Sequence, residues 1–376
     1  MAKRQPAPPP VLPGYTFVRP LGSGGFADVF LYEQDMPRRV VAVKVLCDDA
    51  INPDVLRTFN SEGDILARLS AHASIVTIFH SSISADGRQY FVMDFCPDTM
   101  GARIKKAPLG IADVLDVGVR IAAALETVHR SGVLHRDIKP SNILVTTLGT
   151  PVLADFGIAA GATLIDDYAD VVAKSIPWSA PEVISHLVSG TVPSEIWSLG
   201  ATLYSLLTGR APFELPSGEK IGRAQHMQRI LKTNYIPTGR ADVPERLESA
   251  LRKALAKVPS SRHASMFAFA EELRWIQYEL GMPPTALEVA APEWASATAP
   301  VDFASDSLRG PVISTVRQES RRALRAQTLA SAQRAHHDEP EPKRSSRTKV
   351  AVMGGVVGAT AVAIIVVAIL AITGTI

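Results

Sequence analysis

The stretch His135-Arg136-Asp137-Ile138-Lys139-Pro140-Ser141-Asn142 decides the fold class, together with Asp155-Phe156-Gly157 a short distance further on. A hairpin-like stretch separates the two runs, which places their polar side chains on adjacent segments. Two magnesium ions bound to a triphosphate need hard oxygen ligands, and Asp155 and Asn142 supply them. Asp137 can then orient an attacking hydroxyl, while Lys139 can offset charge on the transferred phosphoryl group. This pattern predicts a site for phosphoryl transfer.

A glycine-rich run lies near the start of the chain, at Leu21-Gly22-Ser23-Gly24-Gly25-Phe26-Ala27-Asp28-Val29. Glycines let backbone N–H groups approach phosphate oxygens, although a tight turn without a ligand would also explain this run taken alone. The run lies between two predicted strands, whereas the dinucleotide fingerprint has a helix after its glycines. Further along, Lys44 follows Val41-Ala42-Val43 in an apolar strand, where a buried ammonium needs an anionic partner. Glu62, in the next predicted helix, is the candidate partner.

Hydrophobic periodicity predicts a β-rich part followed by a helical part. Strands are predicted at residues 15–21, 28–32 and 40–46, the last rich in β-branched residues. Apolar residues recur at helical spacing in residues 54–69, and helical patterns dominate after Met100, as in residues 111–129 and 195–207. We therefore expect one folded domain at residues 14–281, preceded by a disordered N-terminus at residues 1–13.

Composition argues against several other classes of protein. The 376 residues include 39 Lys and Arg and 37 Asp and Glu, so the charge balance gives no argument for a nucleic-acid partner. The two cysteines, Cys47 and Cys96, are far apart and lack metal-ligand spacing, which argues against a disulfide framework or a zinc site. Residues 1–10 contain a proline run in place of an apolar stretch, so no signal peptide is expected there. Most of the chain is expected in the cytoplasm.

The C-terminal part is predicted to attach the domain to a membrane. Residues 282–349 are rich in Ala, Pro, Ser and charged residues, which predicts a disordered juxtamembrane linker. Residues 350–372 carry no charge and would form a transmembrane helix about 35 Å long, enough to cross a hydrocarbon core of ~30 Å. A buried core helix is a weaker alternative, because the segment follows a linker and has no polar face. Basic residues immediately precede the span, at Lys343, Arg344, Arg347 and Lys349. They predict a single-pass protein of the cell membrane with a cytoplasmic folded domain and residues 373–376 outside.

Residues 14 to about 280 resemble the eukaryotic-like, Hanks-type protein kinases and are similar to bacterial membrane-bound serine/threonine kinases. The resemblance implies an α+β fold of two lobes, a β-rich N-lobe and a helical C-lobe, with ATP between them. It implies a non-specific serine/threonine protein kinase that uses Mg²⁺, with Mn²⁺ as a substitute in vitro, and that phosphorylates proteins and itself. Lys139 resembles the serine/threonine subclass rather than tyrosine kinases. Ala180-Pro181-Glu182 resembles the end of the activation segment, which small-molecule phosphotransferases typically lack, and Arg262 resembles the buried partner of Glu182.

The resemblance also implies which residues form the site. The catalytic residues are Asp137, Lys139 and Asn142, and the metal ligands are Asn142 and Asp155. Met93 matches the gatekeeper, and the backbones of Asp94 and Cys96 are expected to bond adenine. The residues expected to bind ATP are Leu21, Gly22, Ser23, Gly24, Gly25, Phe26, Val29, Ala42, Lys44, Glu62, Met93, Asp94 and Cys96.

Two positions differ from the usual pattern of the family without a change of charge. Glu195, before Ile196-Trp197-Ser198, replaces the usual Asp at the start of the central C-lobe helix. It is one methylene longer for holding the backbone of the catalytic loop. Ser175 replaces the usual Thr of the activation segment, and its hydroxyl can still hydrogen-bond between Asp137 and Lys139.

Regulation through the activation segment has two candidate explanations. Kinases of this family typically neutralise the positive pocket at Arg136 with a phosphorylated residue, for which Thr163 and Ser175 are the candidates. The same segment contains the acidic residues Asp166, Asp167 and Asp170. Their carboxylates either substitute in part for phosphate or form only a solvated acidic loop.

Two further alternatives concern partners. A catalytically silent, membrane-anchored scaffold is the rival interpretation, but pseudokinases usually lose a metal ligand, the strand lysine or the catalytic Asp, and this chain retains all three. In the predicted span, Gly354 and Gly358 have the spacing of a close helix-packing face, which favours a homodimer, although glycine is common in such spans.

Overall fold

A computed structural model describes residues 6–24, 27–47, 53–156, 175–215 and 221–290. All of them belong to the first of two compact units of the chain, Met1–Pro300. The segments predicted as a linker after residue 290 and as a membrane span lie outside this set. Among the described residues, none of the helices combines the length and the apolar character needed to cross a bilayer.

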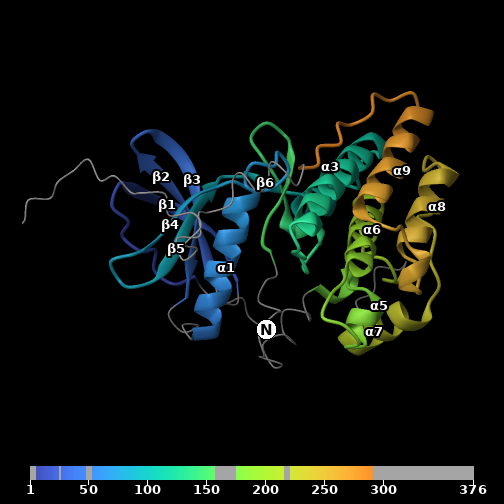
Figure 1. The fold of residues 1–376 in the computed structure, drawn as a ribbon, viewed down its shortest axis with the longest axis horizontal. Helices are drawn as coiled ribbons and strands as arrows, with labels where there is room; N and C mark the ends of the chain where they lie inside the picture. Colours follow the sequence, from blue (N-terminus) through green and yellow to red (C-terminus); the bar gives the residue numbers. More distant parts are fainter. Residues whose placement is uncertain (1–5, 25–26, 48–52, 157–174, 216–220, 291–376) are drawn as a thin grey trace, which may run out of the picture. The chain divides into compact units, whose positions relative to one another are not determined.

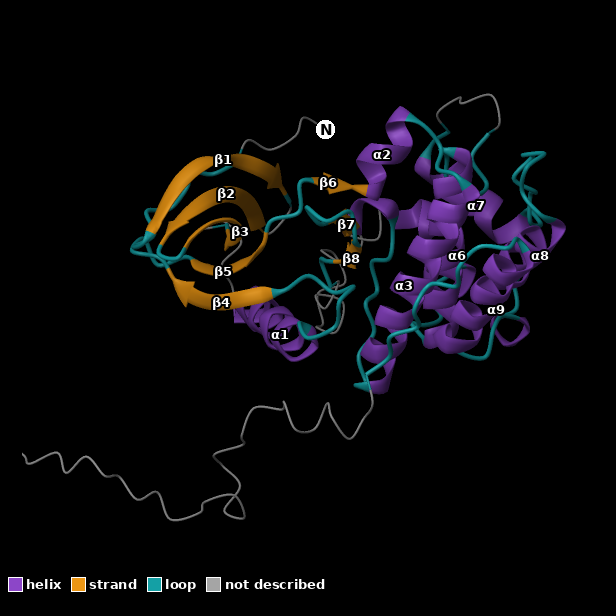
Figure 2. Cartoon of the chain, turned by 90° about the horizontal axis from the view of Figure 1, so that it is seen from above, coloured by secondary structure: helices purple, strands orange, loops and turns teal. Residues whose placement is uncertain are grey.

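The first part of the unit is an antiparallel sheet with one helix, as the sequence predicts. Its strands lie in the order β1-β2-β3-β5-β4, and α1 lies next to β4 (Figure 2). The bounds are β1 (Tyr15–Ser23), β2 (Ala27–Asp35), β3 (Arg38–Leu46), α1 (Pro53–Leu69), β4 (Ile78–Ile83) and β5 (Gln89–Asp94). Side chains of β3 alternate between the two faces of the sheet. Val41, Val43 and Val45 belong to a cluster on one face, whereas Ala42 and Leu46 belong to the main core on the other.

The N-terminal segment covers the outer face of this sheet, so the expected disorder of residues 1–13 is wrong for residues 6–13. Leu12 is 2% exposed and joins the cluster of Val41, Val43 and Val45. Carbonyl groups of the segment accept hydrogen bonds from the sheet, since Tyr32 Oη donates to the oxygen of Pro10 at 2.6 Å. A proline-rich composition does suggest disorder, but prolines also fix an extended backbone at small entropic cost, which suits a strip lying on an apolar surface.

The second part is mostly helical and follows after Met100, again as predicted (Figure 1). Its helices are α2 (Met100–Lys106), α3 (Ile111–Arg130), α5 (Pro181–Ile184), α6 (Val192–Thr208), α7 (Arg223–Lys232), α8 (Glu245–Ala254) and α9 (Met266–Glu279). A small antiparallel sheet joins β6 (Asp98–Thr99), β7 (Ile143–Val145) and β8 (Pro151–Leu153). The described residues therefore form a β-rich lobe and a helical lobe, which confirms the expected fold.

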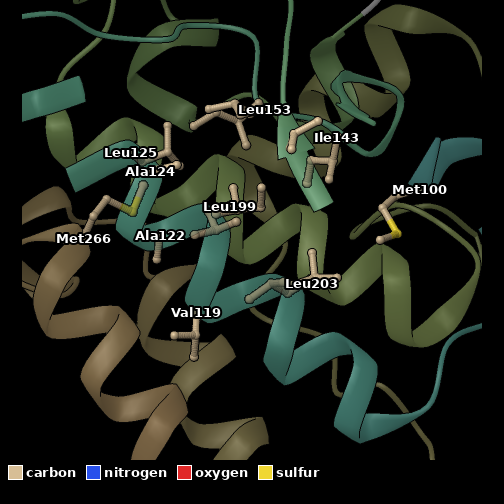
Figure 3. Close-up of a cluster of buried hydrophobic side chains, with 14 of the residues drawn as sticks. Met100, Val119, Ala122, Ala124, Leu125, Ile143, Leu153, Leu199, Leu203 and Met266 are labelled. Atoms are coloured by element: carbon tan, nitrogen blue, oxygen red, sulfur yellow. The ribbon is translucent and has the colours of Figure 1, made fainter. Parts of the chain in front are cut away.

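The core of the helical part lies among α3, α6, α9 and the small sheet (Figure 3). Gly118 lets α3 approach its neighbours, because a Cβ there would lie 2.7 Å from Leu273 Cδ1 and 3.1 Å from Leu203 Cδ1. The N-terminus of α6 is fixed by a capping box between Thr191 and Ser194. A firmly packed α6 matters for function, since it carries Glu195 at its start.

The start of the predicted linker is ordered, which corrects the expectation for residues 282–290. The Thr285 side chain is 7% exposed and donates a hydrogen bond to Asp116 Oδ1 on α3 at 2.8 Å. Leu287 packs against the main core. Low apolar content predicts disorder, but a few well-placed contacts along α3 are enough to hold a short extended segment. Residues 291–349 lie outside the described residues.

Candidate active site

The catalytic loop, residues 133–142, lies between α3 and β7. Arg136 has a φ of 66° and Asp155 a φ of 56°, a left-handed backbone that non-glycine residues rarely adopt. Such conformations persist when surrounding bonds hold them, and they gather at functional sites. His135 links the two segments, since its side chain is fully buried and Nε2 lies 3.1 Å from the carbonyl oxygen of Ala154. Burial lowers the pKa of His135, so its imidazole is neutral and Nε2–H donates to that oxygen.

The carboxylate of Asp137 lies at the centre of a hydrogen-bonded group, as the sequence predicts. Lys139 Nζ donates to both of its oxygens at 2.9 and 2.7 Å. Asn142 Nδ2 donates to Asp137 Oδ2 at 2.8 Å and to the Asp137 carbonyl oxygen at 2.9 Å. Ser175 Oγ donates to Asp137 Oδ1 at 2.5 Å and accepts from Lys139 Nζ at 2.9 Å. The predicted bridge by Ser175 between Asp137 and Lys139 is therefore confirmed.

Glu195 holds the catalytic loop through its carboxylate. The same carboxylate also contacts a second residue, which was not predicted from the sequence. Its Oε1 accepts from the backbone N–H of Arg136 at 2.6 Å, as expected for this position. Its Oε2 lies 2.6 Å from His129 Nε2 at the end of α3. Both side chains are buried, at 3% exposure for Glu195 and 6% for His129. No pattern in the sequence marks His129 for this contact, because it lies among the polar residues that end α3, with Glu126, Thr127 and Arg130.

Lys44 joins the two lobes through two carboxylates. Its Nζ donates to Glu62 Oε1 on α1 at 2.6 Å, which confirms the predicted partner, and to Asp155 Oδ1 at 3.1 Å. Burial disfavours the charged form of Lys44, yet Glu62 and Asp155 outweigh it and raise the pKa of the ammonium. The Lys44 ammonium in turn lowers the pKa of the Asp155 carboxyl. Near neutral pH this corner therefore contains a charged lysine and a charged Asp155.

The oxygen atoms that remain open fit a hard divalent cation. The side-chain nitrogen of Asn142 is committed to Asp137, so its side-chain oxygen Oδ1, which accepts one long hydrogen bond of 3.3 Å from Ser141 Oγ, is the group left for a metal ion. The Asp155 side chain is 52% exposed, and only its Oδ1 contacts Lys44. The backbone N–H of Ala154 donates to the backbone carbonyl oxygen of Asn142 at 3.0 Å. This bond keeps the segments that carry Asn142 and Asp155 side by side. A carboxylate, an amide oxygen and the oxygens of a phosphate form the ligand set that Mg²⁺ prefers.

The residues expected around adenine lie on neighbouring strands. Ala42 of β3 is paired in register with Met93 of β5, and both are buried. The backbone N–H of Asp94 donates to Thr77 at 2.9 Å, so an adenine contact at Asp94 would use its carbonyl group. Burial, followed by the nearby Asp94 charge, raises the pKa of the Cys96 thiol to about 12. The thiol therefore stays protonated near neutral pH, so Cys96 would contact adenine through its backbone rather than react through its sulfur.

The glycine-rich run is described except for Gly25 and Phe26. Gly24 cannot be replaced without movement, because a Cβ there would lie 2.9 Å from the carbonyl oxygen of Ala27. Leu21 and Val29 pack against the main core. The buried Ser23 Oγ has no hydrogen-bond partner in the described part of the chain. An unpaired hydroxyl in a strand–turn–strand segment fits a phosphate-bearing ligand.

The end of the activation segment is held as the sequence predicts. Arg262 is fully buried and binds both carboxylate oxygens of Glu182, at 2.6 and 2.8 Å. The regulatory candidate Thr163 and the acidic residues Asp166, Asp167 and Asp170 lie outside the described residues. Ser175 is 8% exposed and already bonded to Asp137 and Lys139. As a phosphorylation site, Ser175 stays a prediction, and its place in the structure suits the bridging role better.

Comparisons with known proteins agree with this geometry. The model of the protein kinase domain family matches residues 15–274. The serine/threonine-protein kinase PknK of Mycobacterium bovis is 39% identical over 271 residues, which cover 72% of this chain but 24% of PknK. PrkC of Bacillus subtilis is 32% identical over 256 residues, 66% of this chain and 38% of PrkC. PknF of Mycobacterium tuberculosis is 33% identical over 278 residues, 69% of this chain and 56% of PknF. The chain therefore belongs to the protein kinase family, as a bacterial Hanks-type serine/threonine protein kinase.

Proposed function

We propose that this protein is an active, membrane-tethered kinase that transfers the γ-phosphate of ATP to Ser and Thr hydroxyls of proteins and of itself. The observation that carries the proposal is the bonding of Asp137. Its carboxylate is oriented by hydrogen bonds from Lys139, Asn142 and Ser175, so all three polar partners are retained in this chain. A silent scaffold has no need for such an arrangement.

The mechanism follows from what each side chain can do. Asp137 orients the substrate hydroxyl and accepts its proton late in the reaction, while Lys139 offsets charge on the transferred group. Lys44, kept charged by Glu62 and Asp155, would hold the phosphates of ATP, and Asp155 and Asn142 would hold Mg²⁺. When bound, Mg²⁺ neutralises charge on the phosphate oxygens. Most of the rate enhancement then comes from positioning and electrostatics.

Phosphate transfer tests this proposal directly. The full chain is incubated with γ-labelled ATP, Mg²⁺ or Mn²⁺ and a generic protein, and labelled amino acids are identified after hydrolysis. We expect label on Ser and Thr for the wild type, and none above background for Asp137→Asn or Lys44→Met. Equal labelling by wild type and Asp137→Asn, or none by either under both metals, would favour the scaffold instead.

We further propose that residues 350–372 anchor the protein in the cell membrane with the kinase domain in the cytoplasm. The support is the uncharged run and the basic residues before it. Replacing Ile364 and Val366 by Lys should move the protein from the membrane to the soluble fraction, since each charge costs about 2.5–3.5 kcal/mol at the centre of a span. Retention in the membrane fraction would contradict the anchor.

We also propose a homodimer that forms through Gly354 and Gly358 of the predicted span. Two glycines four residues apart let helices approach closely and would raise the local concentration of kinase domains for phosphorylation between copies. A reporter of helix association in membranes should lose its signal with Gly358→Ile. An unchanged signal removes the basis for the dimer.

A further inference from the structure

Residues 282–290 form an extended segment that we call the C-terminal strap. Met282 N donates to the carbonyl oxygen of Gln277, which turns the chain away from the end of α9. Figure 1 shows the strap, in orange, running from α9 past α3. Thr285 bonds to Asp116, and the Ala290 N–H donates to Thr127 Oγ1 at 3.2 Å. The strap therefore runs along α3.

The distance between the two contact points on α3 matches the length of the strap between Thr285 and Ala290 when the strap is fully extended. Asp116 and Thr127 are separated along α3 by about 16 Å, at ~1.5 Å per residue. Thr285 and Ala290 span about the same distance only when the backbone is almost fully extended, at ~3.3 Å per residue. Thr285 is doubly fixed, because its N–H donates to Gln277 Oε1 at 2.9 Å and its hydroxyl accepts from Gln277 Nε2 at 2.8 Å. The strap has little slack between these two ends.

Between those ends, the strap touches the loop that joins α1 to β4, residues 70–77. His72 Nε2 lies 2.7 Å from the carbonyl oxygen of Glu288. The other ring nitrogen, Nδ1, accepts from the N–H of Ser74 at 3.0 Å. Since Nδ1 acts as an acceptor, Nε2 carries the proton, and Nε2–H donates a hydrogen bond to the backbone carbonyl oxygen of Glu288. His72 thus connects the strap to the backbone of the α1–β4 loop.

One half of the α1–β4 loop is packed in the core, since Ile75 and Val76 are each 2% exposed and belong to the main core cluster. The other half, residues 70–73, is exposed or partly exposed. A cavity of about 150 Å³ lies against it, lined in part by Ser70, His72 and Val76 from the loop and by Cys96 and Thr146 opposite. Next to the cavity, the part of the loop around His72 lacks the close packing that Ile75 and Val76 have in the core. Core packing and backbone bonds to β8 therefore anchor residues 74–76, and the hydrogen bond with the strap anchors His72.

The same loop connects to both carboxylates that bind Lys44. It follows directly on α1, which carries Glu62. It is also bonded to Leu153, two residues before Asp155, because Val76 N donates to the Leu153 carbonyl oxygen at 3.0 Å and Leu153 N donates to Ser74 at 2.9 Å. A displacement of the loop would therefore shift both α1, which carries Glu62, and the segment that leads to Asp155.

We propose that the C-terminal strap positions Glu62 and Asp155 around Lys44 through its contact with His72, which makes Thr285 and His72 positioning residues for ATP. Neither residue touches the reacting atoms. The functional kinase unit accordingly extends to residue 290, beyond the region that matches the family model. Because residues 291–349 continue directly from the strap, any factor that binds this predicted linker and pulls on it acts on the ATP site through the same contact.

The test uses the full chain with Thr285→Val, which removes the hydroxyl that bonds Asp116 and Gln277 while keeping the shape of the side chain. Thr285→Ser is the matched control, because it keeps the hydroxyl. Glu288→Gln is a second control, because the contact with His72 uses the Glu288 backbone carbonyl. The readouts are KM for ATP, kcat, thermal stability, and amide hydrogen exchange in residues 53–77 and 282–290.

With Thr285→Val we expect faster exchange in the strap and also in residues 70–77, and a rise of about 3-fold to 30-fold in KM for ATP with a smaller change in kcat. Both controls should resemble the wild type. His72→Ala should produce the same rise in KM, and the two changes combined should add little to either one, because both break one connection. A merely structural role would lower thermal stability and leave KM unchanged below the melting range.

Faster exchange in the strap with unchanged exchange in residues 70–77 and unchanged KM overturns the proposal. If Thr285→Val leaves amide exchange in the strap unchanged, Leu287→Asp is used to detach the strap, since it brings a charge against the apolar core. Unchanged exchange in residues 70–77 of the Leu287→Asp variant then overturns the proposal. The inference rests on the proposed kinase activity only for the kinetic readout. A wild type without phosphate transfer but with coupled exchange would refute the activity and leave the strap's role intact.

Discussion

Shortening Glu195 by one methylene tests whether the length of this side chain fixes the catalytic loop. The change is Glu195→Asp, which introduces the residue that most kinases have at this position. In this chain the longer carboxylate reaches both the backbone N–H of Arg136 and the ring of His129, each at 2.6 Å. Removing one carbon–carbon bond of about 1.5 Å pulls at least one of these contacts beyond hydrogen-bonding distance.

The magnitude follows from burial and from the backbone of Arg136. A buried hydrogen bond to a charged group contributes about 1.5–3 kcal/mol, and the N–H left behind has no water to replace it. Arg136 has a φ of 66°, so this bond also holds a disfavoured conformation one residue before Asp137. If most of that free energy is lost in the transition state, kcat falls about 10-fold to 100-fold. Stability should fall by a similar amount, visible as a lower Tm.

Glu195→Gln separates length from charge. Gln keeps the reach to the Arg136 N–H but weakens the contact with His129, so it should retain more activity than Asp if length decides. The assay measures kcat at saturating ATP and protein substrate, together with Tm. An Asp variant with wild-type kcat and Tm, or one more active than Gln, would refute the reasoning that the extra methylene is needed here.

Three further outcomes are expected. Ser175→Ala should lower kcat about 3-fold to 10-fold by removing the bridge between Asp137 and Lys139, and Ser175→Thr should restore it; equal rates for Ala and Ser would contradict the bridge. Burial lowers the pKa of His135, His226 and His263 below 6.5, so the unfolded chain binds more protons than the native chain in mild acid. Tm should be steady above pH 7 and decline toward pH 5, and a Tm that rises on acidification would be inconsistent with this sign. Cys96, with a thiol pKa of about 12, should be alkylated at pH 8 far more slowly in the native protein than in urea, as followed by peptide mass spectrometry.

The chemistry of the site could be read from the sequence because its residues come in short, ordered motifs. Asp137, Lys139 and Asn142 share one loop, and the partner of Lys44 was predicted because a buried ammonium requires an anion. Contacts between distant segments carry no such local signal. Neither Leu12 on the outer face of the sheet nor Thr285, which bonds to Asp116 of α3, is marked by periodicity. The proline-rich or alanine-rich composition around them even argued for disorder.

Two separate supports therefore hold the site, and they should have different kinetic signatures. Glu195 fixes the loop that carries Asp137, which orients the hydroxyl, so its loss appears mainly in kcat. The α1–β4 loop fixes the carboxylates around Lys44, which would hold the phosphates, so its loss appears mainly in KM for ATP. The two supports share no residue, so the free-energy effects of Glu195→Asp and Thr285→Val should add within about 0.5 kcal/mol. A larger coupling would mean that His135, which bonds Ala154 and lies one residue before Arg136, transmits strain from one support to the other.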